Sequence, residues 1–520
     1  MKSNVNALPA SWCLVRLDEL VRNPKNDIVD GPFGSNLKAS EYISEGTPII
    51  RLQNVTPAQF VEKNIKFVSE DKARSLARHS YLPGDLLVTK LGDPLGEACI
   101  VPSDFPPGII VADIVRIRLH PSLNKSAVMY AINSSHIQDE FKRLTKGTTR
   151  PRVNLQHVRA MHAPLLPREE QDRIVAEIEK QFSRLDAATT ALKRVQANLK
   201  RYRASVLNAA CEGRLVPAEA ELARKEGREY EPADKLLERI LRERRARWEA
   251  DTLAKLIACG KPPKDDAWKR KYKEPAVPIT GEQPIPREGW CWTRIGYAFD
   301  CVVPNRDKPK SFTGPIPWLT LPDFTEDIEV GISDSGLGLS MEEVSRYRAR
   351  LIPEGSVVMS CVGRFGITAV LKFPSVINQQ LHAFLIPSWL TAKYFAYALR
   401  TQVDYMRSLS TATTIAYLNK DNCNSVPVPL PPIQEQERIA AELDRHFSCI
   451  HALETQLDTS LRRLASLRRS ILEAAFSGRL TTQDPNDEPA SVLLERIRAE
   501  RSATGSTTVA RRRRQEFVHA

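Results

Sequence analysis

The chain has 520 residues, more than one ordinary hydrophobic core needs, so we expect two or more domains. Its 75 Lys and Arg residues exceed its 63 Asp and Glu residues, and the formal net charge of +12 favours a polyanionic partner. No apolar run approaches the roughly 18 to 20 residues that span a bilayer, no signal-peptide pattern opens the chain, and the nine cysteines form no C-x-x-C pair, which together indicate a reduced, cytoplasmic location.

Residues 1–165 have the pattern of a globular domain that mixes helices and strands. Short apolar runs such as residues 85–89 are bounded by Gly and Pro, which is typical of strands. Residues 126–144 have the apolar spacing of a helix. We therefore predict one α+β domain in this part of the chain.

Residues 166–258 are predicted to form a first helical spacer. No further proline occurs between Pro167 and Gly213, which suit the start and the stop of one helix of about 40 residues, roughly 60 Å long. Apolar residues recur at every seventh position, as they do in the seam of a coiled coil. The seam residues are Ile178, Leu185, Leu192, Leu199 and Val206.

Residues 259–287 contain six prolines among several lysines, which predicts a Pro/Lys-rich linker. Residues 288–430 then repeat the mixed pattern of the first domain. A short apolar run at residues 356–360 predicts a strand, and residues 390–409 predict a helix. We therefore predict a second α+β domain that is related to the first.

Residues 431–501 are predicted to form a second helical spacer, which is free of proline between Pro432 and Gly478. Its seam residues, again seven apart, are Leu443, Ile450, Leu457, Leu464 and Ile471. Residues 502–520 contain four consecutive arginines and no apolar periodicity, which predicts a basic disordered tail. Such a tail either remains solvated or makes loose contacts with phosphates.

The two spacers are copies of each other. A shift of 265 residues aligns residues 167–215 with residues 432–480 without a gap, and 21 of the 49 aligned positions are identical. A helix with one apolar stripe must bury that stripe, and the nearest partner of matching length lies in the same chain. The predicted fold class is α+β, with two mixed domains separated by two long helices that pair as an antiparallel coiled coil in a pseudo-two-fold internal repeat. The alternative is two unrelated helices, each in a bundle of its own.

The sequence lacks the motifs of enzymes that act on DNA. It has no G-x-x-x-x-G-K-[ST] phosphate loop for ATP hydrolysis, and no acidic-or-Asn, Pro, Pro, aromatic tetrad of an adenine methyltransferase. The nine histidines show no metal-binding spacing. We therefore expect a chain without catalytic residues, metal or cofactor of its own.

Short motifs stand in a fixed order along the chain, and some of them occur twice. They are the openings at residues 8–12 and 286–290 that are similar to Leu-Pro-x-x-Trp, Asp-Gly-Pro-Phe-Gly-Ser-Asn-Leu-Lys at 30–38, Gly-Thr-Pro-Ile-Ile-Arg at 46–51, Leu-Pro-Gly-Asp at 82–85, Asn-Gln-Gln at 378–380, and Pro-x-x-Glu-Gln-x-Arg-Ile at 167–174 and 432–439. With these motifs the chain resembles, over essentially its whole length, the specificity (HsdS) subunits of type I restriction-modification systems.

The resemblance implies two target recognition domains, each of which reads one half of a bipartite DNA site through the major groove, while the paired helices set the spacing. It also implies two modification subunits, which methylate adenine with S-adenosylmethionine, and two restriction subunits, which use ATP and Mg²⁺ to translocate and cleave DNA. The chain itself would be a non-catalytic DNA-binding subunit. Its second domain has no counterpart of the Gly-Pro-Phe-Gly-Ser stretch at 31–35, which implies two different half-sites.

Candidate DNA-binding residues come from the polar loops of the two domains. Lys and Arg position a protein on phosphates, and Arg, Lys, Asn and Gln read base edges. The candidates are Lys38, Arg51, Lys90, Arg150 and Arg152 in the first domain, and Arg306, Lys308, Lys310, Arg364 and Gln379 in the second. For each candidate, the alternative is a solvated surface position without a role in binding. The neighbours of Gln379, which are Asn378 and Gln380, are alternatively expected to hydrogen-bond to the backbone.

Two other functions fit the same pattern. The chain would be the recognition part of a single-chain type of restriction and methylation enzyme if no separate methyltransferase gene lay beside its own. It would be a coiled-coil scaffold with two protein-binding heads if it bound duplex DNA without sequence preference, or not at all.

Overall fold

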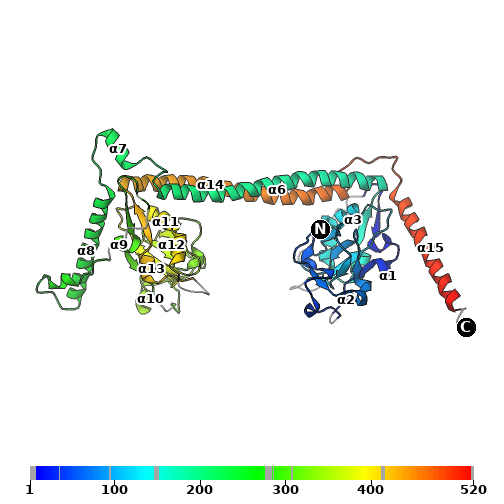
Figure 1. The fold of residues 1–520 in the computed structure, drawn as a ribbon, viewed down its shortest axis with the longest axis horizontal. Helices are drawn as coiled ribbons and strands as arrows, with labels where there is room; N and C mark the ends of the chain where they lie inside the picture. The colour runs from blue at the N-terminus through cyan, green and yellow to red at the C-terminus, as the bar shows by residue number, and fades with distance from the viewer. Residues whose placement is uncertain are drawn as a thin grey trace. The chain divides into compact units, whose positions relative to one another are not determined.

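The computed structural model describes residues 8–33, 36–92, 95–145, 151–275, 284, 286–305, 308–410 and 416–516, with side chains described as far as residue 503. The chain divides into two units, Met1–Lys193 with Leu457–Ala520, and Arg194–Gln456. Each unit holds one globular domain and part of both long helices (Figure 1). Within the described residues, no helix has an apolar stretch that is long enough to cross a membrane.

The first globular domain is closed by a two-stranded stem, in which β1 (Cys13–Arg16) pairs antiparallel with β12 (His162–Leu165). Between the stem strands lie two four-stranded sheets with the orders β2-β11-β8-β9 and β6-β3-β10-β7. Their strands are β2 (Ile28–Asp30), β11 (Ile114–Ile117), β8 (Leu86–Thr89), β9 (Ala98–Ile100), β6 (Lys66–Val68), β3 (Thr47–Ile50), β10 (Gly108–Ile110) and β7 (Ser80–Tyr81). The strand predicted at residues 85–89 is thus present as β8.

The helix predicted over residues 126–144 is in fact two helices, α3 (Lys125–Ile132) and α4 (Ser135–Leu144). The break lies at Asn133, whose side-chain amide donates to the carbonyl of Ala98 in β9 at 2.8 Å and accepts from the amide of Ala98 at 3.0 Å. A contact with a distant strand therefore ends a helix that local spacing would have continued.

The second globular domain has the same plan. Its stem pairs β13 (Cys291–Arg294) with β22 (Pro427–Leu430), and its sheets have the orders β14-β21-β18-β19-β16 and β17-β15-β20. The strands of these sheets are β14 (Asp300–Val302), β21 (Leu381–Leu385), β18 (Val357–Ser360), β19 (Thr368–Leu371), β16 (Glu329–Val330), β17 (Gly338–Leu339), β15 (Ile316–Leu319) and β20 (Val376–Ile377). The predicted helix at residues 390–409 is again two helices, α11 (Ala392–Arg400) and α12 (Val403–Ser408).

The long helices are α6 (Arg168–Cys211) and α14 (Ile433–Phe476), each of 44 residues. In the first unit the start of α6 shares a hydrophobic core with the end of α14, and farther along α6 Asp186 is ion-paired with Arg468. In the second unit the end of α6 shares a core with the start of α14, and Arg203 binds Glu454 at 3.1 Å. The helices therefore run antiparallel within each unit, as predicted.

The seam residues face the interior of this pair or of the domain beside it. Five of them are buried, and the other five are half-buried. The buried ones are Ile178, Val206, Leu443, Ile450 and Leu457, and the half-buried ones are Leu185, Leu192, Leu199, Leu464 and Ile471. The apolar residues at every seventh position therefore mark the face of each long helix that is turned away from solvent.

Each long helix is followed by shorter ones, which are α7 (Glu219–Glu226) and α8 (Ala233–Ala258) after α6, and α15 (Ala490–Glu516) after α14. The stretch expected to be a linker contains a short helix, η6 (Asp266–Lys271), which packs back on α8 through aromatic rings. The expected disordered tail is helical as far as Glu516, in agreement with the high helix propensity of its arginines.

Ile450 tests the importance of the seam. It is 1% exposed in α14, so Ile450→Ala should lower the free energy of unfolding by about 2 to 5 kcal/mol because it leaves a cavity. Leu453→Ala, three residues along the same helix, is the matched control, because Leu453 is 42% exposed and its truncation should cost less than about 1 kcal/mol. Denaturant unfolding measures both, and equal effects of the two substitutions would contradict a buried seam.

Candidate nucleic-acid interface

At one end of the sheet β2-β11-β8-β9 in the first domain, three chain segments hydrogen-bond to one another through their backbones. The segment after β8 pairs with residues 151–153. The backbone amide of Val153 donates to the carbonyl of Lys90 at 3.1 Å, and the amide of Gly92 donates to the carbonyl of Pro151 at 3.1 Å. The amide of Lys90 donates to the carbonyl of Asp113, directly before β11, at 2.9 Å. We call residues 90–92, 113 and 151–153 the strand-end platform of this domain.

The second domain has the same platform at residues 361–363, 380 and 416–418. Leu418 donates to the carbonyl of Cys361 at 2.9 Å, Gly363 donates to that of Ala416 at 2.7 Å, and the amide of Cys361 donates to the carbonyl of Gln380 at 2.8 Å. Isolated bridges join Leu91 to Arg152 in the first domain and residues 362 and 417 in the second. The backbone of the platform is therefore repeated bond for bond.

The side chains on the two platforms differ. In the first domain Arg152 is half-exposed and ion-paired with Asp113. In the second domain the matching positions hold Tyr417, which is 42% exposed, and Gln380. The same backbone therefore presents a charged pair in one domain and uncharged polar groups in the other.

Lys90, a candidate DNA-binding residue, lies beneath the surface. Its side chain is 2% exposed and its ammonium group is ion-paired with Asp30, the last residue of β2. The ammonium also lies 4.4 Å from the ring centroid of Phe33, which is itself 54% exposed. Lys90 is thus positioned to hold the loop that follows β2, and its charge is already satisfied by Asp30.

The other candidates in the first domain are placed as follows. Lys38 is exposed beside the short helix η3 (Ala39–Glu41), and its backbone amide donates to Glu41 at 2.6 Å. Arg51 is half-buried and donates to the carbonyl of Asn64 at 2.6 Å, so its guanidinium already binds backbone. Arg150 lies outside the described residues. Among the first-domain candidates that the structure describes, Lys90 and Arg152 share the platform.

In the second domain Arg364 and Gln379 are exposed and lie directly beside the platform residues Gly363 and Gln380. Lys308 and Lys310 are also exposed, in the segment before β15, while Arg306 lies outside the described residues. The oxygen of the Asn378 side chain accepts from the amide of Gln380 at 3.1 Å. As the sequence suggested, this Asn holds the backbone.

Tyr417, Asp113 and Phe33 are polar or aromatic residues of this region that sequence reasoning did not select. The signal that finds Tyr417 is the 265-residue shift, which also aligns Thr148, Thr149 and Asn154 with Thr413, Thr414 and Asn419. Asn154 and Asn419 both cap a short helix after the platform, α5 (Leu155–Ala160) and α13 (Lys420–Asn424), each through its side-chain oxygen at 2.8 Å. The repeat therefore begins upstream of the long helices.

The glutamate of the repeated Glu-Gln-x-Arg motif is buried at the start of each long helix and accepts hydrogen bonds there. In the first unit the buried carboxylate of Glu170 accepts from the indole of Trp12 at 2.7 Å and from the amide of Gln483. In the second unit the buried Glu435 accepts from the backbone amide of Glu219 at 2.9 Å. Burial raises the pKa of both carboxyl groups.

The arginine of the motif makes a second, equivalent contact. Arg173 is ion-paired with Asp487 after the end of α14, and Arg438 is ion-paired with Glu219 after the end of α6 at 2.7 Å. The start of each long helix is therefore bound to the segment that follows the other long helix. This arrangement explains why the motif occurs once at each helix start.

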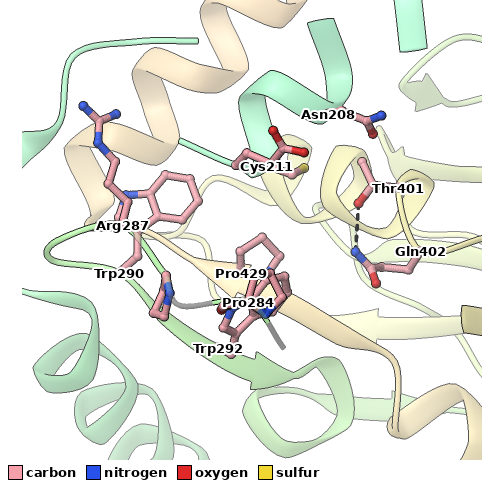
Figure 2. Close-up of a pocket in the computed structure, with 11 residues that line it drawn as sticks. Asn208, Cys211, Pro284, Arg287, Trp290, Trp292, Thr401, Gln402 and Pro429 are labelled. Atoms are coloured by element: carbon pink, nitrogen blue, oxygen red, sulfur yellow. Dashed lines mark hydrogen bonds between the residues drawn. The ribbon is translucent and has the colours of Figure 1, made fainter. Parts of the chain in front are cut away.

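A pocket of about 380 Å³ lies where the end of α6 meets the second domain (Figure 2). Trp290, Trp292 and Pro429 form much of its wall, and none of its lining residues belongs to the platform. Cys211 also lines it, and the position that matches Cys211 in the first unit is filled by the buried Phe476. The pocket therefore lies at the junction where the second unit has the smaller Cys211 side chain in place of the phenylalanine of the first unit.

Within the parts of the chain that the structure describes, no group of three His, Cys, Asp or Glu side chains is arranged to hold a metal ion. The platform itself offers hydrogen-bond donors and acceptors on a rigid backbone. Such a surface can bind and discriminate a partner by its hydrogen-bonding pattern.

Comparisons with known proteins agree with this architecture. Residues 301–463 match the family described as the type I restriction modification DNA specificity domain. The type I restriction enzyme EcoBI specificity subunit of Escherichia coli is 22% identical over 549 aligned positions, which cover 99% of this chain and 98% of that protein. The chain belongs to the DNA specificity subunits of type I restriction-modification systems.

A second relative and a solved structure extend the comparison. The EcoDI specificity subunit of Escherichia coli is 29% identical over 145 residues, which cover 26% of this chain and only 31% of that protein. A chain from a structure of complex assembly and conformational transition of the type I R-M system has the same fold, with a TM-score of 0.61, 18% identity, and coverage of 91% of this chain and 100% of that one. The family confirms the expectation of a non-catalytic specificity subunit.

The contribution of the Lys90–Asp30 ion pair to the stability of this specificity subunit can be tested, because the second domain has uncharged residues at the matching positions. Lys90→Met leaves the mostly buried Asp30 carboxylate without a cation, which should lower the free energy of unfolding by about 3 to 5 kcal/mol. The matching strand positions of the second domain hold the uncharged Cys361 and Val303. The double variant Lys90→Met with Asp30→Val should therefore regain most of the lost stability in denaturant unfolding. A double variant as unstable as the single one would refute this role of the pair.

Proposed function

We propose that each globular domain reads one half of a bipartite DNA target through its strand-end platform, that the paired helices set the spacing of the halves, and that the chain thereby directs adenine methylation and restriction by partner subunits. The observation that carries this proposal is the repetition of one platform backbone with different side chains. A protein that must read two different half-sites with one fold needs such a combination.

The side chains around the platforms are of the kinds that read bases. Arg pairs bidentately with guanine, and Asn or Gln pairs with adenine, in the major groove. The first platform carries Arg152 and the second is flanked by Arg364 and Gln379. The exposed Lys38, Lys308 and Lys310 suit contacts with phosphates, which position a protein without reading sequence.

The spacing part of the proposal rests on the two long helices. Both α6 and α14 are continuous helices of 44 residues that begin in one unit and end in the other. Glu170 ties the first domain to the start of α6 through Trp12, and Glu435 ties the start of α14 to the segment after α6. We therefore assign the number of base pairs between the half-sites to the helices.

The proposed partners are two modification subunits and two restriction subunits, which would bring S-adenosylmethionine, ATP and Mg²⁺. An exposed apolar stripe on the long helices supports a helical partner surface. Its members are 41% to 47% exposed although they stand at the heptad spacing next to the buried seam. They are Val195 and Tyr202 on α6, and Leu453 and Leu467 on α14.

An exchange of the second domain tests the two-reader model. Cys291 and Leu430 are opposite each other at the base of the stem, so residues 291–430 can be replaced by the corresponding domain of another specificity subunit without touching either long helix. Because domains with their own cores fold independently, we expect only one half-site to change. Genome-wide mapping of methylated adenine in cells with the hybrid chain measures both half-sites and their spacing. If both halves change, or the spacing changes, the model is wrong.

Two point variants test the platforms separately. Arg152→Ala should weaken discrimination at one base of the first half-site by about 1 to 3 kcal/mol and leave the second half-site unchanged. Arg364→Ala should have the same effect on the second half-site alone. Each variant serves as the control for the other, and competition binding with duplexes altered at single positions measures the effect. Uniform weakening on all duplexes would indicate phosphate contacts instead of base reading.

A further inference from the structure

The second unit carries a folded basic element that the reading of half-sites does not use. Residues 242–275 form a hairpin of the last part of α8 and the short helix η6, which we call the basic hairpin. The ring of Trp248 lies 6.1 Å from that of Trp268, nearly parallel to it, and 5.2 Å from that of Tyr272. These contacts fold the hairpin into a defined shape.

The hairpin is attached to the second domain by the first part of α8. Leu236 and Ile240 are buried in the core of that domain. Arg244 donates to the carboxylate of Asp300 at 3.0 Å and to the carbonyls of residues 296 and 297. In Figure 1, α8 starts near α7 and extends along the side of the second domain, away from the long helices. The first part of α8 is therefore packed on the second domain and holds the hairpin beside it.

The charge of the hairpin is strongly positive. Residues 242–275 contain eleven Lys and Arg residues against six Asp and Glu residues, a net charge of +5 out of the +12 of the whole chain. Among the described residues, seven of these cations are exposed and take part in no ion pair, whereas Glu249, Asp266 and Glu274 are neutralised by Arg245 or Lys269. The seven are Arg242, Lys255, Lys261, Lys264, Arg270, Lys271 and Lys273.

We propose that the basic hairpin binds the phosphate backbone of duplex DNA beside the half-site of the second domain, independently of base sequence. This inference rests on the proposed function, because it needs the second domain to lie on DNA. Neutralisation of phosphates by Lys and Arg releases condensed counterions and so adds affinity without specificity.

The composition favours DNA over a protein surface. Five of the seven unpaired cations are lysines, a residue that is depleted in protein interfaces and common in phosphate contacts. The hairpin also exposes Leu253 and Ile257, but these two side chains are 36% and 58% exposed and stand beside many more charges than an apolar interface tolerates.

The test compares two variants of the full chain that remove the same charge. Lys264, Arg270 and Lys271 are changed to Gln in the hairpin variant, and the exposed Arg462, Arg463 and Arg469 of α14 are changed to Gln in the control. Each protein is purified in complex with the modification subunits of its own system. Binding is measured from low to high salt on a duplex that carries the mapped target and on a random duplex of equal length.

The hairpin variant should bind both duplexes more weakly at low salt, and the slope of log affinity against log salt should become shallower by roughly 2 to 3. Its preference for the target over the random duplex should remain as in the parent protein, and the control should keep the parent slope. An unchanged slope for the hairpin variant, or an equal change of slope for the control variant, would overturn the inference. The inference would also be overturned if the hairpin variant lost the modification subunits while its own DNA binding remained intact.

The same measurements separate the two hypotheses. If the parent protein shows no preference for the target, the proposed function fails. If it shows that preference but the hairpin variant keeps the parent slope, only the inference about the basic hairpin fails.

Discussion

Each unit of this specificity subunit depends on a carboxylate that is buried where a long helix begins. Glu170 joins the first domain, α6 and the segment after α14, because it accepts from both Trp12 and Gln483. Glu435 makes the equivalent junction with the segment after α6. A buried carboxylate is costly unless it is hydrogen-bonded, so these bonds hold the first domain and the segment after α14 on the start of α6, and the segment after α6 on the start of α14.

This attachment leaves the far side of each domain free to vary. The stem strands end next to the buried carboxylates, where each domain shares a hydrophobic core with both long helices. Farther from the stem, each domain has hydrophobic clusters that consist of its own residues alone. At the platform the backbone bonds are kept while Arg152 and Asp113 are exchanged for Tyr417 and Gln380. Attachment and recognition therefore use different residues, so one can change without the other.

The sequence by itself determined the repeat, the two long helices, their antiparallel pairing and the family. These features depend on patterns that are local or periodic along the chain. The seven-residue spacing of Ile178 or Leu443 records burial on one helix face, and the 265-residue shift records duplication, so neither needs knowledge of distant contacts.

Only the tertiary structure decided which side chains of the domains are available. Lys90 has the sequence context of an exposed cation but is buried against Asp30, 60 residues away. Asn133 ends a helix because it bonds to Ala98, and η6 folds because Trp268 and Tyr272 meet Trp248. Each outcome depends on a contact between residues far apart in the chain, and such contacts leave no periodic trace in the sequence.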